Sequence, residues 1–218
     1  FRNNIGDISL TEKRIITDAY RYFLPYAQAL TNTVYNTYFT TDHLIWTYGA
    51  HDWPLVVKAD EDFSDQIWYH SATPGANPNR QHVWTDMYYD SVNREWMISS
   101  LCPVYVEDEF IGVVGHDFIL REIIDLGRTS LDRDDALLFF FDQDGNIIAH
   151  PETQFLLEKH VANNLELNVK SLSDSSLNRT LQKIRSSENE GFLFTDEASH
   201  KRLVLYFPLK SINWKLIY

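Results

Sequence analysis

The stretches VWTDMYYD, residues 83–90, and FIGVVGHD, residues 110–117, decide the fold of this chain. In both, aromatic and apolar residues are interleaved with carboxylates, where a plain core strand would carry Leu, Ile and Val. Aromatic ring faces attract cations, and carboxylates neutralise them. The mixture is therefore typical of strands that line a pocket for a small polar or cationic molecule.

The residues between and after these stretches predict a β-hairpin. Two β-patterned runs, 95–106 and 109–118, are joined by the acidic turn Glu107-Asp108. Pro103 predicts that the first strand lies at an edge or contains a bulge, because proline cannot donate a ladder hydrogen bond. Gly112 and Gly115 predict that another group approaches the backbone of the second strand closely.

Composition bounds the class of protein. The 218 residues are 44% apolar and 14% aromatic, which is typical of a folded protein of one or two domains. The formal net charge of −12 argues against nucleic acid and anionic membrane surfaces, since both would be repelled. The single cysteine, Cys102, lies in a β-run and is interpreted as a small buried hydrophobe.

The chain contains no run of 18 apolar residues that would span a bilayer. It begins at Phe1 without a methionine and ends at Tyr218 on an apolar strand. We interpret it as a piece of a longer protein whose membrane segments lie just outside it.

The first part of the chain predicts a long helix and then an α+β unit. Ser9 to Glu12 form a capping box, and apolar residues at helical spacing follow up to Leu24. Pro25 predicts a kink or a restart before 27–30. We expect the apolar stripe to pack on a sheet, with a dimer seam as the alternative. Strands 34–39 and 44–49, a short helix within 63–71 and a lid-like loop, 72–81, follow.

The second part repeats this order of elements. A short helix is expected to end at Gly127, where we place the module boundary. A hairpin turning at Asp144-Gly145, a helix over 174–185 and strands 191–195, 202–207 and 214–218 follow. The string beginning at Asp142 lacks the glycine and glutamate positions of a calcium loop, so we reject calcium.

We therefore predict an α+β fold in which an N-terminal helical segment, 1–32, precedes two stacked PAS-like modules. The modules span 33–127 and 128–218, each with a central antiparallel sheet. No phosphate-binding, nucleophile or zinc motif is present. An enzyme interpretation survives only as the paired carboxylates Asp86, Asp90 and Asp117, as in a carboxylate-based hydrolase.

The order of these pieces resembles the membrane-distal module of a double Cache sensor domain. A helix ending in Trp68-Tyr69, the 84–90 strand, a strand with Pro103-Val104-Tyr105, and Gly112 to Asp117 closing the next strand carry the resemblance. It implies the extracytoplasmic ligand-binding part of a bacterial histidine kinase, chemoreceptor or diguanylate cyclase. It also implies a long helix followed by two PAS-like modules.

The resemblance also implies which residues bind a ligand. In amino-acid-binding members, a Tyr, an Asp two residues later and a distant Asp hold the amino group. Tyr88, Asp90 and Asp117 match these positions, and Trp68 occupies the position of the tryptophan in the motif. We therefore expect one cavity of the first module to be lined by Trp68, Tyr69, Trp84, Tyr88, Asp90 and Asp117.

The half of the motif that holds a ligand carboxylate does not match. Gln66 stands where the family motif has Arg, and Glu61 falls near the place of its first Tyr. A bidentate clamp for a carboxylate is therefore missing. Arg80 replaces it only if the lid folds inward, so Gln66 and Arg80 are secondary candidates.

These inferences predict the periplasmic sensing domain of an inner-membrane histidine kinase or diguanylate cyclase. It would bind a small cationic amine or amino-acid-like molecule, with no metal, cofactor or nucleic acid. Transmembrane helices would flank it, and it would form a homodimer in the full receptor. The alternatives are a chemoreceptor sensor, an interaction module with a vestigial pocket, and the hydrolase.

Overall fold

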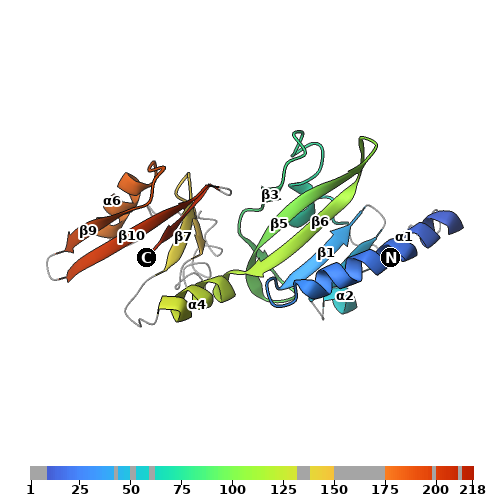
Figure 1. Cartoon of the computed structure of the whole chain (residues 1–218), viewed down its shortest axis with the longest axis horizontal. Helices are drawn as coiled ribbons and strands as arrows, with labels where there is room; N and C mark the ends of the chain where they lie inside the picture. The colour runs from blue at the N-terminus through green and yellow to red at the C-terminus, as the bar shows by residue number, and fades with distance from the viewer. Residues whose placement is uncertain are drawn as a thin grey trace. The chain divides into compact units, whose positions relative to one another are not determined.

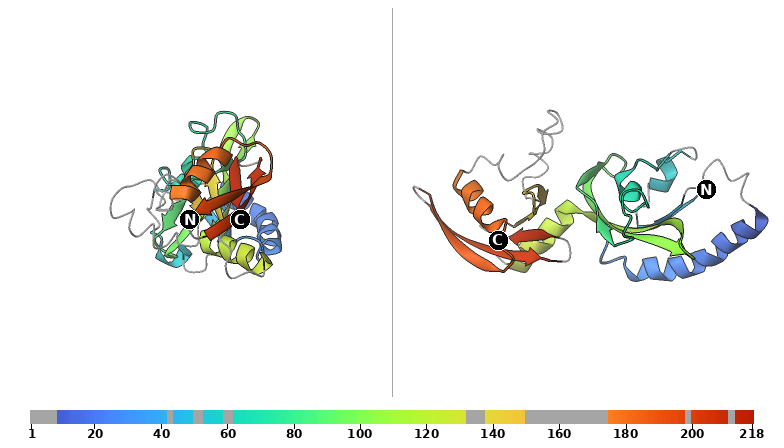
Figure 2. Two further views of the ribbon diagram at one scale, coloured as in Figure 1. Left: turned by 90° about the vertical axis from the view of Figure 1, so that its left-hand side faces the viewer. Right: turned by 90° about the horizontal axis from the view of Figure 1, so that it is seen from above.

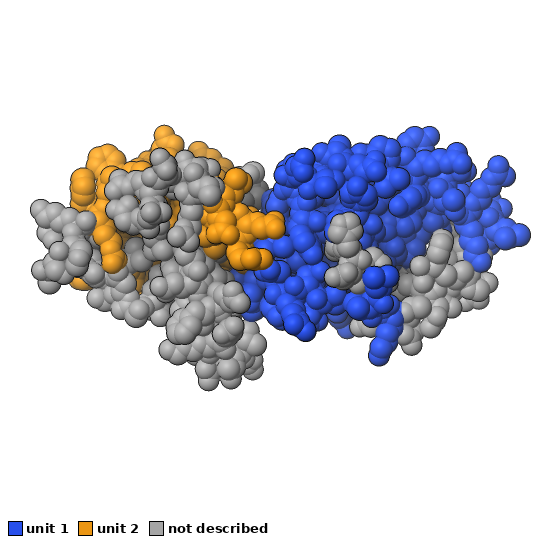
Figure 3. All heavy atoms as spheres, turned by 90° about the horizontal axis from the view of Figure 1, so that it is seen from below, with its two compact units in different colours: residues 1–119 blue, residues 120–218 orange. Residues whose placement is uncertain are grey.

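The computed structural model of the chain describes residues 9–41, 44–49, 53–58, 62–131, 138–149, 175–197, 200–210 and 213–218. The chain divides into two compact units, residues 1–119 and residues 120–218 (Figure 3). Each unit carries helices and one antiparallel sheet, so the predicted α+β class is confirmed. The predicted module boundary at residue 127 remains a prediction, and the two compact units divide eight residues earlier.

The first unit is built on a six-stranded antiparallel sheet (Figure 1). Its strand order is β2-β1-β6-β5-β3, and β4 also pairs with β5, along residues 95–97, whereas β3 pairs along residues 100–101. The strands are β1 (Asn36–Thr40), β2 (Ile45–Tyr48), β3 (Val83–Trp84), β4 (Tyr88–Asp90), β5 (Glu95–Val106) and β6 (Glu109–Ile119). Two short helices, α2 (Trp53–Val56) and α3 (Ile67–His70), lie on the other face of the sheet from the N-terminal helix α1 (Leu10–Ala29) (Figure 2).

The β5–β6 hairpin forms as the sequence predicts. Glu107 and Asp108 both have positive φ, 47° and 70°, the left-handed geometry that a two-residue hairpin turn requires. Pro103 lies beyond the stretch of β5 that pairs with β3, so its missing N–H costs no ladder bond there. The register shifts between Val104 and Tyr105, next to the proline, as expected of a bulge.

The two glycines of β6 allow close packing against β1. A Cβ on Gly115 would lie 2.1 Å from the Tyr38 ring, and one on Gly112 would lie 2.2 Å from the Thr40 carbonyl oxygen. Both distances are too short for any other side chain. The Tyr38 ring therefore packs directly against Gly115, which fixes one wall of the site described below.

Helix α1 differs from its prediction at two points. The helix does not restart after Pro25 but is continuous through it, and Phe23 and Ala27, on either side of the proline, are buried. Aromatic contacts with Trp46 hold this part of the helix to β2. The expected stripe does not pack along its full length, since Ile15 is 64% exposed. The helix packs on β2, a strand of only four residues, whereas the helix has 20.

The second unit repeats the topology with different packing. Its five strands are β7 (Phe139–Asp142), β8 (Ile147–Ala149), β9 (Gly191–Glu197), β10 (His200–Leu209) and β11 (Trp214–Ile217), in the order β8-β7-β11-β10-β9. Helix α6 (Ser175–Ile184) packs on this sheet. The core is an apolar cluster that includes Phe139, Phe141, Leu181 and Ile217.

Gly127 does not end a helix. Helix α4 runs from Leu120 to Leu131 and contains the glycine. A glycine inside a helix costs only about 0.5–1 kcal/mol relative to alanine, and four further residues continue the helix here. The glycine was therefore too weak a signal to place the helix end.

Candidate functional site

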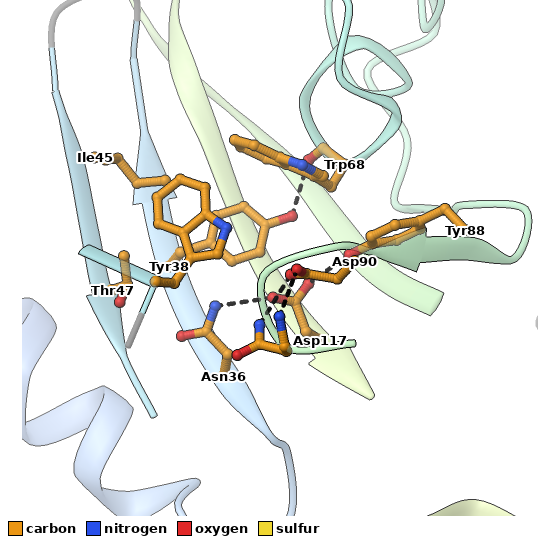
Figure 4. A pocket seen from close by; sticks show the side chains of 10 residues that line it. Asn36, Tyr38, Ile45, Thr47, Trp68, Tyr88, Asp90 and Asp117 are labelled. Atoms are coloured by element: carbon orange, nitrogen blue, oxygen red, sulfur yellow. Dashed lines mark hydrogen bonds between the residues drawn. The ribbon is translucent and has the colours of Figure 1, made fainter. Parts of the chain in front are cut away.

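The first unit contains a pocket on the face of the sheet that carries α2 and α3 (Figure 4). Its empty space is about 330 Å³, including its opening to solvent. The side chains that line it are Asn36, Tyr38, Ile45, Thr47, Trp53, Trp68, Tyr88, Asp90, Asn93 and Asp117.

Asp117 lies at the floor of the pocket and is only 8% exposed. Its Oδ1 accepts hydrogen bonds from Ser99 Oγ at 2.6 Å and from Tyr88 OH at 3.3 Å, and its Oδ2 accepts one from Asn36 Nδ2 at 2.8 Å. The pleat brings the group together, because Asp117 pairs directly with Asn36 on β1 and with Ser99 on β5. Three strands therefore hold one carboxylate from three sides.

Burial and hydrogen bonding act on this carboxyl in opposite directions. Burial raises the pKa of Asp117 from 3.8 to about 6, although the hydrogen bonds from Ser99, Asn36 and Tyr88 each lower it. Burial and the nearby Asp117 charge raise the pKa of Tyr88 above its usual range. At neutral pH the site therefore holds a carboxylate beside a protonated phenol, and the carboxylate lacks a cationic partner among the described residues that line the pocket.

Asp90 is the second carboxylate of the pocket, and it organises the turn that follows β4. Its Oδ1 accepts from the backbone N–H of Val92 at 2.7 Å and of Asn93 at 3.0 Å, and its Oδ2 accepts from Asn93 Nδ2 at 2.9 Å. Tyr35 OH donates to Asn93 Oδ1 at 2.9 Å and ties this turn to the start of β1. Asp90 is thereby held in place without being neutralised.

Aromatic rings form the upper wall. Tyr38 OH donates to the backbone oxygen of Trp68 at 2.8 Å, so the ring that lies over Gly115 also positions α3. The Trp68 ring contacts the rings of Tyr38 and Trp53 edge to face, with centroids 5.5 and 5.9 Å apart. Together with the two carboxylates, these rings suit a ligand that carries a positive charge.

Four of the six predicted site residues line this pocket: Trp68, Tyr88, Asp90 and Asp117. Tyr69 is buried in the adjoining core cluster instead. Trp84 is on the opposite face of the sheet, because it pairs with Ser100, the neighbour on β5 of Ser99, whose side chain donates to Asp117. Its ring packs on Phe118, with centroids 5.4 Å apart. The ligand-binding role of the four remains a prediction.

The secondary candidates lie elsewhere. Gln66 is exposed at the start of α3 and is not among the pocket-lining residues. Arg80 forms an ion pair with Asp108 at 2.6 Å and stacks on the Tyr105 ring at 4.2 Å. The loop expected to act as a lid is thus attached to the tip of the β5–β6 hairpin. Glu61 lies outside the described residues.

Sequence reasoning missed six residues of the pocket: Asn36, Tyr38, Ile45, Thr47, Trp53 and Asn93. Asn36 and Tyr38 belong to β1, whose pairing with β6 spans about eighty positions of the chain. A usable signal was the aromatic and polar alternation of β1, since residues two apart share a face. Among the described residues no cluster of His, Cys, Asp and Glu suits a metal ion. No described helix is both long and apolar enough to cross a membrane.

Comparison with known proteins assigns the family. The family model described as Cache domain matches residues 3–218. The chain belongs to the Cache domain family. The resemblance inferred from the sequence is thereby confirmed, and with it the expectation of a sensor domain rather than an enzyme.

One relative is a chemoreceptor. The methyl-accepting chemotaxis protein McpC of Bacillus subtilis is 26% identical over 172 residues, which cover 79% of this chain and 22% of that protein. This Cache domain thus spans about a fifth of the length of the relative it matches.

Solved structures show the same fold. The ligand-binding domain of the Pseudomonas aeruginosa amino acid chemoreceptor PctB, in complex with L-Arg, is 20% identical, with a TM-score of 0.59 over 88% of this chain and 76% of that one. The ligand-binding domain of the Campylobacter jejuni chemoreceptor Tlp3, in complex with L-valine, is 18% identical, with a TM-score of 0.59 over 95% and 74%.

Proposed function

We propose that this Cache domain is the extracytoplasmic sensor of a bacterial chemoreceptor and that its pocket binds a small cationic amine. The observation that carries the proposal is the composition of the pocket: two carboxylates and four aromatic rings, with no Lys, Arg or His among the ten residues that line it. A cation gains charge-assisted hydrogen bonds and ring contacts there. A ligand carboxylate finds no positive partner and is repelled by Asp90 and Asp117.

The relatives support the receptor class. The chemotaxis protein of B. subtilis and the two chemoreceptor domains favour a chemoreceptor over the histidine kinase or diguanylate cyclase that the sequence first indicated. PctB and Tlp3 were solved with amino acids, which supports a small-molecule ligand. In this proposal transmembrane helices flank the domain, and two copies act together in the full receptor.

A matched set of three ligands tests the proposal. L-valine carries an ammonium and a carboxylate, isobutylamine carries only the ammonium, and isovalerate carries only the carboxylate. Isothermal titration at neutral pH should show that isobutylamine binds more tightly than L-valine and that isovalerate does not bind. Tighter binding of L-valine than of isobutylamine would contradict the amine assignment.

A variant pair tests the role of the floor carboxylate. Asp117→Ala should weaken isobutylamine binding by about 2–4 kcal/mol, because it removes a desolvated charge partner. Asp86→Ala is the control, since Asp86 is exposed, lies outside the pocket and carries the same charge. Circular dichroism should show both variants folded. Equal affinity of the two folded variants would remove Asp117 from the site.

A further inference from the structure

Asn36 carries a buried hydrogen-bond acceptor that no other described group satisfies. The residue is 7% exposed and lines the pocket. Its Nδ2 donates to Asp117 Oδ2 at 2.8 Å, whereas its Oδ1 has no hydrogen-bond partner. Figure 4 shows the amide nitrogen directed to Asp117 and the oxygen directed away from it, toward the side of the pocket with Thr47. Native proteins leave few buried polar atoms unpaired, and those they leave call for an explanation.

The orientation of this amide is set by its neighbour. Turning the Asn36 side chain over would place its oxygen against the Asp117 carboxylate, so that two acceptors would face each other without a proton between them. The nitrogen therefore stays on Asp117. The oxygen is left as a fixed acceptor at the wall of the pocket.

The Oδ2 atom of Asp117 can accept one further hydrogen bond. Its Oδ1 is occupied by Ser99 Oγ and Tyr88 OH, but its Oδ2 accepts only from Asn36 among the hydrogen bonds of the described chain. A carboxylate oxygen has two lone pairs and accepts about two hydrogen bonds. One site on Oδ2 therefore remains for a donor in the pocket.

In Asp90, too, one carboxylate oxygen accepts two hydrogen bonds and the other accepts one. Its Oδ1 accepts from two backbone N–H groups, those of Val92 and Asn93, while its Oδ2 accepts from Asn93 Nδ2 alone in the described part of the chain. The pocket thus offers three acceptors with spare capacity: one amide oxygen and one oxygen from each carboxylate. Figure 4 shows Asn36, Asp90 and Asp117 side by side at the same end of the pocket.

We infer that the pocket is built for a primary ammonium group and discriminates against quaternary ammonium, with Asn36 Oδ1 accepting one of the three N–H bonds. This inference rests on the proposed function and specifies its ligand class. A primary ammonium brings three donors to three acceptors. A quaternary ammonium has the same charge and favourable contact with the rings, but it leaves the acceptors unpaired. A site with buried polar groups rejects analogues that cannot pair them.

Stepwise methylation of one ligand tests the inference with the unmodified domain. Isobutylamine and its N,N-dimethyl and N,N,N-trimethyl derivatives share one charge and one alkyl chain, and they carry three, one and no N–H donors. Isothermal titration should show affinity falling at each step, with the trimethyl ligand weaker by at least about tenfold, the factor equivalent to about 1.4 kcal/mol. A trimethyl ligand that binds as tightly as the amine overturns the inference and leaves the proposed amine site intact.

Two variants locate the selectivity on Asn36. Asn36→Leu and Ser99→Ala each remove one hydrogen bond to Asp117, but only the first removes the free acceptor. Ser99→Ala should weaken the primary and quaternary ligands by the same factor. Asn36→Leu should weaken the primary ligand further, so that the ratio between the two falls by about tenfold.

The outcomes separate the two proposals. A folded Asn36→Leu domain that keeps the full preference for the primary amine overturns the role given to Asn36. Failure of all three cations to bind the unmodified domain overturns the amine site and this inference together. Circular dichroism checks that each variant is folded, and the methylation series stands without either variant.

Discussion

Five strands follow the same order across the sheet in both units, but the side chains at one corresponding position are polar in the first unit and apolar in the second. In each sheet the first residue of the first strand pairs with a residue near the end of the last strand. In the first unit this pair is Asn36 and Asp117, and in the second it is Phe139 and Ile217. The first pair lines a polar pocket, and the second belongs to an apolar core cluster.

The difference shows that topology does not decide which unit carries a site. A carboxylate is tolerated at the position of Asp117 because Ser99, Tyr88 and Asn36 donate to it. Ile217 instead belongs to an apolar cluster with Phe141, Leu181 and Ile184, and its cross-strand partner Tyr206 brings only one hydroxyl. Side-chain partners on adjacent strands, rather than the backbone frame, determine what the position can hold.

Moving the charge to the second unit should have the largest effect. Ile217→Asp should destabilise the domain by about 3–5 kcal/mol, because it buries a charge in an apolar cluster that lacks the three donors found around Asp117. Denaturant unfolding followed by circular dichroism would measure this as a lower midpoint. Ile217→Val, which removes one methylene, should cost only about 0.5–1.5 kcal/mol. Equal unfolding midpoints for the Asp and Val variants would show that polar groups of the second unit stabilise a carboxylate at this position.

The parts of the fold that were predicted correctly depend on residues close in sequence. The β5–β6 hairpin follows from the Glu107-Asp108 turn and the alternation around it, and α6 follows from its apolar spacing. The failures were of two kinds. The end of α4 was misplaced because the penalty of one glycine is small, and the packing of α1 was overstated because a stripe does not reveal how far its sheet extends.

The site was predicted only in part because its remaining contacts are distant in sequence. Asp117 and Tyr88 stand in recognisable motifs, but the hydrogen bond from Asn36 to Asp117 joins residues 81 positions apart. Trp84 was assigned to the pocket because it belongs to the stretch 83–90, in which aromatic residues and carboxylates are interleaved. The register of β3 on β5, which no local pattern specifies, puts it on the opposite face.

Both units contain a glycine packed under a tyrosine ring, and substituting each glycine should distinguish an effect on stability from an effect on binding. Gly115 lies under the Tyr38 ring, and Gly191 lies under the Tyr206 ring, where a Cβ would come within 2.1 and 2.4 Å of the tyrosine. Changing either glycine to alanine should cost about 1–3 kcal/mol of stability through overpacking. Only Gly115→Ala should also weaken isobutylamine binding, since Tyr38 positions Trp68.

Gly75→Ala is the matched control for this pair, because no atom lies within 4 Å of the new methyl group. It should leave both the melting temperature and the affinity unchanged. Loss of binding in a folded Gly191→Ala variant would show that the second unit takes part in the site.

The smallest expected effect is a pH dependence that runs in opposite directions for binding and for stability. Burial raises the pKa of Asp117 to about 6 in the folded domain, above its ordinary value of 3.8. The raised pKa means that the folded state binds this proton more tightly than the unfolded state. The contribution of Asp117 to stability is therefore complete below about pH 3.8 and is lost as the pH rises through about 6.

An ammonium ligand requires the ionised carboxylate, so its affinity should change with the opposite sign. Between about pH 7 and about pH 5 it should fall by about tenfold. Isothermal titration of isobutylamine across this interval measures the fall. Thermal unfolding of the unliganded domain and of Asp117→Asn measures the stability change that is due to Asp117 as the difference between the two. Burial also lowers the pKa of His116, but its contribution to the pH dependence is common to both proteins and cancels in the difference. An affinity that is constant across the interval would mean that Asp117 is not the carboxylate that the ligand contacts.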